Sequence, residues 1–184
     1  WQAVQAAFDM LDSLARFNER QHTRKKTPFR IGIGISYGEV TLGNIGSDKK
    51  MDYTVIGEEV NLAARMESLT KDFHEPLVFT DTVRKLVADR APCRPLGVVM
   101  VRGITLPVHV WTARRALTEV ERRAWDLFGK GLNHFNAREF GQAVSFFSET
   151  QKLLPGDGPS RRFLGACRTF STNPPGPTWA GTLV

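Results

Sequence analysis

The sequence predicts an α+β fold followed by an α-helical tail. The first 20 residues carry apolar side chains at spacings of three and four, which is typical of one face of a helix. From about residue 29 to 113, short β-like runs alternate with two helical stretches. Beyond Arg115 the composition becomes helical. We therefore expect the order helix, strands, helix, strand, helix, strands, and then the tail.

The first third of the chain is expected to hold one helix and three strands. The opening helix ends before Pro28, because proline biases the preceding residue away from helix. Residues 29–36, FRIGIGIS, place apolar side chains on one face and mostly glycine on the other, so another backbone or a ligand can come close. Residues 39–46 and 51–56 are two further β-like runs, and we interpret them as a hairpin arm.

The next stretch, up to residue 113, is expected to alternate helices and strands. Glu58 and Glu59 lie in the first turn of a helix, where acidic groups suit the positive end of the helix dipole. Thr80 or Asp81 is a suitable cap for the following helix. The expected elements are a helix from Gly57 to about Leu69, a strand at 76–79, a helix to Val87, and strands at 95–101 and 106–113.

The tail is expected to be a helical hairpin at residues 116–170. One window matches the tetratricopeptide (TPR) pattern at its key positions: Gly131, Phe140, Ala143, Phe147 and Pro155. Stacked arrays need about three such units. We therefore expect a single TPR-like hairpin that docks on residues 1–115 or on a partner. Residues 171–184, rich in proline and glycine, are expected to be extended.

Composition excludes several classes of function. The chain is 41% hydrophobic and 24% charged, and its apolar runs fall far short of the roughly 20 residues that cross a bilayer. Its basic residues are spread out despite a formal charge of +6, so we expect no nucleic-acid partner. Cys93 and Cys167 indicate neither a disulfide framework nor a zinc site. The first residue, Trp1, leads us to expect a fragment of a longer protein. We expect both cysteines to be reduced and the protein to be cytoplasmic.

The most informative stretch is residues 32–66, GIGISYGEVTLGNIGSDKKMDYTVIGEEVNLAARM. It resembles class III adenylate and guanylate cyclases of bacterial type, with the glycine-rich strand, the hairpin arm, YTVIG and VNLAAR in uninterrupted order. The resemblance implies that residues 1–115 are the C-terminal half of a ferredoxin-like cyclase catalytic domain, truncated at its N-terminus.

Asn61 and Arg65 are the candidate catalytic residues. They are four positions apart, so they stack on one face of the helix near its positive end, where a polar pair can hold an anion. By spacing alone, a solvent-exposed polar pair is equally typical of such a helix. The resemblance implies that Asn61 orients the ribose and that Arg65 stabilises the transition state.

The resemblance also implies a set of nucleotide-binding residues. Thr54 matches the position that selects the base, and threonine there goes with adenine. Val55 and Ile56 would give backbone contacts and an apolar wall to the purine. Arg102, which directly precedes Gly103, would reach the triphosphate.

Further expectations concern cofactors and partners. The resemblance implies ATP as substrate, a homodimer with the site at its interface, an upstream sensor domain, and a possible membrane anchor upstream. It also implies two Mg²⁺ or Mn²⁺ ions on aspartates upstream of this chain; within the chain we assign no metal ligand. Two alternatives stay open: a guanylate cyclase, and a non-catalytic cyclase-like module for dimerisation or regulation.

Overall fold

The structure is a computed structural model that describes residues 1–47, 50–100 and 106–183. The predicted triphosphate contact, Arg102, lies outside the described residues. Within the described ranges, no helix is both long and apolar enough to span a bilayer.

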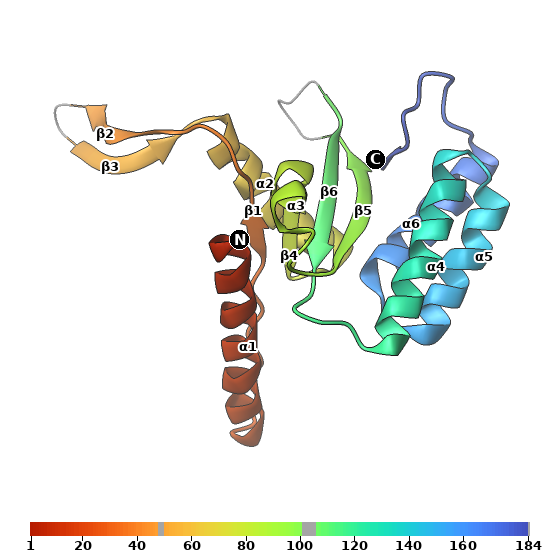
Figure 1. Cartoon of the computed structure of the whole chain (residues 1–184), viewed down its shortest axis with the longest axis horizontal. Helices are drawn as coiled ribbons and strands as arrows, with labels where there is room; N and C mark the ends of the chain where they lie inside the picture. The colour runs from red at the N-terminus through yellow and green to blue at the C-terminus, as the bar shows by residue number, and fades with distance from the viewer. Residues whose placement is uncertain (48–49, 101–105, 184) are drawn as a thin grey trace.

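The elements follow the predicted order as far as residue 113 (Figure 1). They are α1 (Gln2–Thr23), β1 (Ile33–Ile35), β2 (Thr41–Ser47), β3 (Lys50–Ile56), α2 (Glu58–Phe73), β4 (Leu77–Thr80), α3 (Asp81–Val87), β5 (Cys93–Val99) and β6 (Val108–Ala113). The tail adds α4 (Glu119–Asn136), α5 (Phe140–Leu153), α6 (Gly158–Thr172) and β7 (Thr182–Leu183). The α+β class is therefore confirmed.

One five-stranded mixed sheet has the order β1-β4-β6-β5-β7, and β2 pairs with β3 in a separate antiparallel arm. The strand predicted at 29–36 is shorter than expected. Asn18 accounts for the difference at Phe29, because its side-chain amide donates to the Phe29 carbonyl and accepts from the Phe29 N–H, both at 2.8 Å. The backbone groups of Phe29 are thus bonded to α1 rather than to a neighbouring strand.

The glycine face of β1 lies against α2. A Cβ atom added to Gly34 would stand 2.2 Å from the Ala63 carbonyl oxygen and 2.2 Å from the Glu67 nitrogen. No side chain fits at that distance, so glycine is required for this strand and helix to pack. The close approach that the glycines predicted is therefore made by the backbone of α2.

The tail has three helices where the sequence led us to expect a two-helix hairpin. Gly156 takes a positive φ of 89° after α5, and the Asp157 carboxylate then accepts from the Ser160 N–H at 3.0 Å and so caps a new helix, α6. Residues 171–184 are not extended throughout, because α6 continues to Thr172 and β7 pairs with β5. Gly156 and Asp157 are typical residues at the end of one helix and the start of the next. The match to the TPR pattern favoured a two-helix hairpin instead.

The two faces of the sheet have separate cores. On one face α1 and α3 pack around nine buried side chains: Val4, Ala7, Phe8, Leu77, Phe79, Val83, Val87, Ala91 and Ala113. On the other face α2 and the tail share one core. Residues 1–113, which we call the body, contribute Met66, Phe73, Val78, Leu96, Val99 and Val110. The tail contributes Phe128, Leu132, Phe135, Phe140, Ala143, Phe147, Phe163, Cys167, Phe170 and Leu183. The boundary at residue 115 is thus crossed by continuous packing.

Candidate functional site

The candidate site is built on the passage from β3 into α2. Gly57 links the two with a φ of 153°, and a Cβ there would stand 3.4 Å from the Glu39 carbonyl oxygen. Only glycine adopts this backbone readily in so close a place. The turn therefore fixes where α2 begins, and it leaves the first helical N–H groups, with their partial positive charge, at this end.

Glu59 ties the start of α2 to the segment after β1. Its carboxylate accepts a hydrogen bond from the Ser36 hydroxyl. A Cβ on Gly38 would lie 2.6 Å from Glu59 Cγ, so the segment packs closely over this side chain. The sequence interpretation assigned Glu59 only to the helix dipole and missed this anchoring role. The available signal was the Ser-x-Gly pattern directly after the glycine-rich strand.

Asn61 and Arg65 stand on one flank of α2, away from the buried side chains of Met66 and Phe73. Asn61 is exposed and Arg65 is half-buried. Across residues 1–47, 50–100 and 106–183, neither side chain makes a hydrogen bond or ion pair. The structure thus brings the two predicted catalytic residues together and leaves both side chains available to a ligand.

Thr54 is exposed on β3, and its strand partner is Gly43. A Cβ added to Gly43 would meet no atom within 4 Å, so the space beside Thr54 is open. Since side chains alternate along a strand, Ile56 shares the face of Thr54 and Val55 points to the opposite face. For a ligand on the Thr54 face, Val55 can therefore offer only its backbone.

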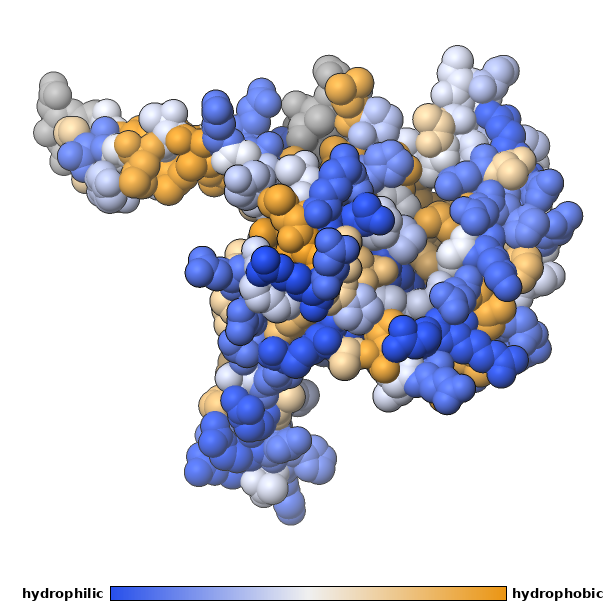
Figure 2. Space-filling view, in the orientation of Figure 1, coloured by the Kyte–Doolittle hydropathy of each residue, from blue (hydrophilic) through white to orange (hydrophobic). Residues whose placement is uncertain are grey.

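The opposite face of the arm is apolar and exposed. The register places Leu42 opposite Val55, and the neighbouring Tyr53 and Met51 lie on the same side. Their exposed fractions are 56% for Leu42, 38% for Val55, 70% for Tyr53 and 59% for Met51. The arm projects from the sheet, and apolar side chains gather on its surface (Figures 1 and 2). We call Leu42, Met51, Tyr53 and Val55 the apolar arm face.

The two hollows found in the described part of the chain lie away from these residues. One hollow of about 600 Å³ lies between the N-terminus of α5 and the C-terminus of α6, and another of about 520 Å³ lies between α1 and the C-terminus of α2. Neither is lined by Thr54, Asn61 or Arg65. Among the described residues, no group of three or more His, Cys, Asp or Glu side chains is placed to hold a metal ion. The two metal ions that the resemblance implies stay an expectation, because their aspartate ligands are expected upstream of this chain.

Comparison with known protein families identifies the fold. The model of the adenylate and guanylate cyclase catalytic domain matches residues 1–113, from the start of α1 to the end of β6. The chain belongs to this family. The match ends where the body ends, so the three-helix tail lies beyond it.

Individual relatives agree with the family. An adenylate cyclase of Anabaena cylindrica is 40% identical over 85 residues, which cover 44% of this chain and 17% of that cyclase. The terminal-differentiation specific adenylate cyclase of Dictyostelium discoideum is 24% identical over 172 residues, 90% of this chain and 8% of the relative. This similarity reaches into the tail. This chain thus spans only a small part of the length of each of these relatives.

A solved structure supports the same fold. The crystal structure of the adenylyl cyclase CyaB from P. aeruginosa is 32% identical, with a TM-score of 0.51 over 58% of this chain and 56% of that one. The family prediction from residues 32–66 is therefore confirmed. The individual roles of Thr54, Asn61 and Arg65 stay predictions.

Proposed function

We propose that this chain is the C-terminal half of an adenylate cyclase catalytic domain, which converts ATP to cyclic AMP and pyrophosphate in signal transduction. The observation that carries the proposal is the pair Asn61 and Arg65, free of protein partners in the described structure, at the start of the helix that follows Thr54. The adenylate cyclases among its relatives support ATP as substrate.

In the proposed reaction the ribose 3′ oxygen bonds to the α-phosphorus and gives up its proton, while the bond from that phosphorus to the bridging oxygen of pyrophosphate breaks. Negative charge shifts among the phosphoryl oxygens as the reaction proceeds. Arg65 is suited to stabilise this charge, because a guanidinium stays protonated and offers donors in a fixed planar fork. The Asn61 amide can both donate to and accept from the ribose.

Base selection falls to Thr54 in this proposal. Its hydroxyl both donates and accepts hydrogen bonds, as does the edge of adenine, and the open space beside Gly43 gives a purine room on this face. Ile56 would contact the ring, and Val55 would contribute its backbone. Arg102 would reach the triphosphate.

The active form is proposed to be a homodimer. Exposed apolar patches of this kind mark interaction sites, so the apolar arm face supports association with a second copy. Each site would then combine Asn61 and Arg65 of one subunit with groups of the other. The two Mg²⁺ or Mn²⁺ ions would be held by residues outside this chain, and a sensor domain upstream would control the cytoplasmic cyclase.

The test uses the full-length protein with equal ATP and GTP and with Mn²⁺, and identifies the product by mass spectrometry. We expect cyclic AMP. Arg65→Ala should lower kcat by roughly two to three orders of magnitude, the scale of losing one transition-state donor. Arg122→Ala, at an exposed position on α4, is the matched control and should keep full activity.

Each other outcome has a defined meaning. Full activity of Arg65→Ala would refute the catalytic role of Arg65. Cyclic GMP as the main product would refute base selection by Thr54. If a folded wild-type dimer yields no cyclic nucleotide, the non-catalytic alternative is correct.

A further inference from the structure

The C-terminal end of α2 is enclosed by the tail. Its last residue, Phe73, is fully buried. A Cβ added to Gly158, the first residue of α6, would lie 2.0 Å from the Phe73 carbonyl oxygen and 2.6 Å from His74 Cβ. One turn along α6, the Arg162 guanidinium lies 5.2 Å from the centre of the Phe73 ring. The tail therefore touches the end of the helix whose other end carries Asn61.

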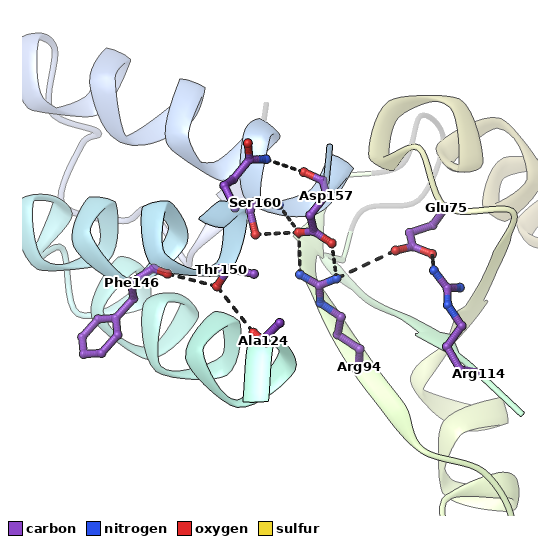
Figure 3. A network of polar contacts seen from close by, with 9 residues as sticks. Glu75, Arg94, Arg114, Ala124, Phe146, Thr150, Asp157 and Ser160 are labelled. Atoms are coloured by element: carbon purple, nitrogen blue, oxygen red, sulfur yellow. Dashed lines mark hydrogen bonds and ion pairs between the residues drawn. The ribbon is translucent and has the colours of Figure 1, made fainter. Parts of the chain in front are cut away.

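A buried ionic network joins the tail to the same place (Figure 3). Arg94 on β5 is 1% exposed, and its two terminal nitrogens donate to the two carboxylate oxygens of Asp157 at 2.6 and 2.8 Å. The same guanidinium lies 3.8 Å from the carboxylate of Glu75, two residues beyond α2. Arg114 completes the network with an ion pair of 2.8 Å to Glu75.

Asp157 has two partners at once. Besides Arg94, it accepts from the Ser160 N–H at 3.0 Å and from the Ser160 hydroxyl at 2.6 Å, so it also starts α6. Burial raises the pKa of Asp157, but the hydrogen bonds and charge of Arg94 and the hydrogen bonds from Ser160 outweigh it, and the pKa falls below its ordinary value. The carboxylate is therefore charged at neutral pH and fixes the direction of the Arg94 fork.

We propose that Asp157 is a positioning residue for α2: by its two-point pairing with Arg94 it holds the tail against the end of the helix that carries Asn61 and Arg65. The inference rests on the proposed function, because it assigns the tail a part in that reaction. Arg65 precedes Phe73 by eight residues, about 12 Å along a helix. A helix of this length moves as a rigid rod, so a shift at Phe73 displaces Arg65 as well.

The two ends of α2 are held in different ways. At the start, Gly57 sets the turn and Glu59 bonds to Ser36, so this end is fixed within the family domain. At the other end, β1 and β4 pack against the helix, and the tail adds contacts from Gly158 and Arg162, which lie beyond residue 113, where the family match stops. Asp157 holds this part of the tail in place through Arg94. A misplacement of about 1 Å in a catalytic group can cost about 100-fold in rate. Loss of the second anchor should therefore appear in kcat.

The experiment compares full-length Asp157→Asn with wild type. Asparagine has nearly the volume of aspartate and caps helices as well, so α6 should still start at this position while the charged pairing with Arg94 is lost. We expect kcat to fall about ten-fold or more with the KM for ATP little changed, and faster hydrogen exchange in residues 58–73. Asp126→Asn, an exposed position on α4, is the matched control and should change neither.

Arg94→Lys gives a second, independent test, because it keeps the charge and removes the planar fork. Arg94→Lys should also lower kcat. If Asp157→Asn does not fold, the proposal is tested with Arg94→Lys alone. Both variants are assayed well below their unfolding temperatures. Wild-type kcat in a folded variant would overturn the proposal, even with a lower Tm, because the tail would then only stabilise the fold. If wild type makes no cyclic nucleotide, the proposed function fails, and unchanged exchange in residues 58–73 would still refute the anchoring separately.

Discussion

The β2–β3 arm and the three-helix tail both extend from the same sheet, and they treat apolar side chains in opposite ways (Figure 1). On the arm, Tyr53 is 70% exposed and Met51 59%. In the tail, Phe128, Phe147 and Phe163 are fully buried against one another and against the sheet. The tail therefore buries its apolar side chains within the chain, whereas the arm leaves its apolar side chains exposed.

The arm and the tail are both rich in apolar side chains, so their sequences alone do not show which of them is buried. The tail contributes to the stability of the folded chain, whereas we propose that the arm contributes to association. Substitutions in the two regions should therefore change different measurements.

The largest effect is expected from Phe163→Ala. The Phe163 ring centre lies 5.6, 4.8 and 5.1 Å from those of Phe128, Phe135 and Phe147. Removing a fully buried phenylalanine costs about 3–5 kcal/mol. We expect a loss of that size in the free energy of unfolding of the full-length protein, measured with denaturant. Tyr53→Ala on the arm is the comparison. At protein concentrations at which the chain is monomeric, it should change the free energy of unfolding by less than about 0.5 kcal/mol; equal losses would refute the contrast.

A somewhat smaller effect is expected from the buried network, and it depends on pH. The pKa of Asp157 is lowered in the folded state, so its stabilisation is fully present above its unfolded pKa, near 3.9, and is lost as pH falls through the folded pKa. Asp157→Asn should cost about 3 kcal/mol at pH 7. In Tm measurements, its difference from wild type should stay constant from pH 7 to 5 and shrink below about pH 4. A constant difference down to pH 2 would contradict the pairing.

The stability that Glu75 contributes depends on pH in the opposite direction to that of Asp157. Burial raises its pKa, and the charges of Arg114 and Arg94 and the hydrogen bond from Arg114 only partly offset this. Arg94 is closer to Asp157 than to Glu75, which explains why Asp157 keeps its charge more readily. A raised folded pKa means that Glu75 adds stability as pH falls from above that pKa toward the unfolded value. Glu75→Gln should remove this gain, so its Tm relative to wild type should be lower at acidic pH than at neutral pH.

The smallest of these effects is expected from the arm, and it concerns association. Replacing Leu42 and Tyr53 together by serine should leave the unfolding of the chain nearly unchanged. It should weaken the proposed homodimer by at least about 2 kcal/mol, roughly 30-fold or more in Kd, because each subunit loses two apolar side chains from the interface. Sedimentation equilibrium of the full-length protein measures the change. An unaltered Kd would place the interface elsewhere.

The sequence predicted the arm, the start of α2 and the order of elements well, since these depend on local patterns. The hairpin follows from alternation around a turn-forming segment, and the turn into α2 from Gly57 and the acidic residues after it. Alternation along β3 also could have shown that Val55 faces away from Thr54.

The tail was predicted less well because its contacts are long-range. Nothing near Arg94 distinguishes it from a surface arginine, and its partner Asp157 lies 63 positions further along the chain. The pairing of β7 with β5 likewise depends on where the tail docks. Such contacts appear only when the elements are placed in three dimensions.

The most direct test of the half-site carried by this chain is a mixing experiment with two inactive full-length proteins. One carries Arg65→Ala, and the other has alanine in place of the metal-binding aspartates expected upstream. In a mixed dimer one site would combine the intact groups of both subunits, so we expect roughly a quarter of wild-type cyclic AMP production, since half of the dimers are mixed and each holds one intact site. No activity in the mixture, with mixed dimers demonstrated, would contradict a site shared between subunits.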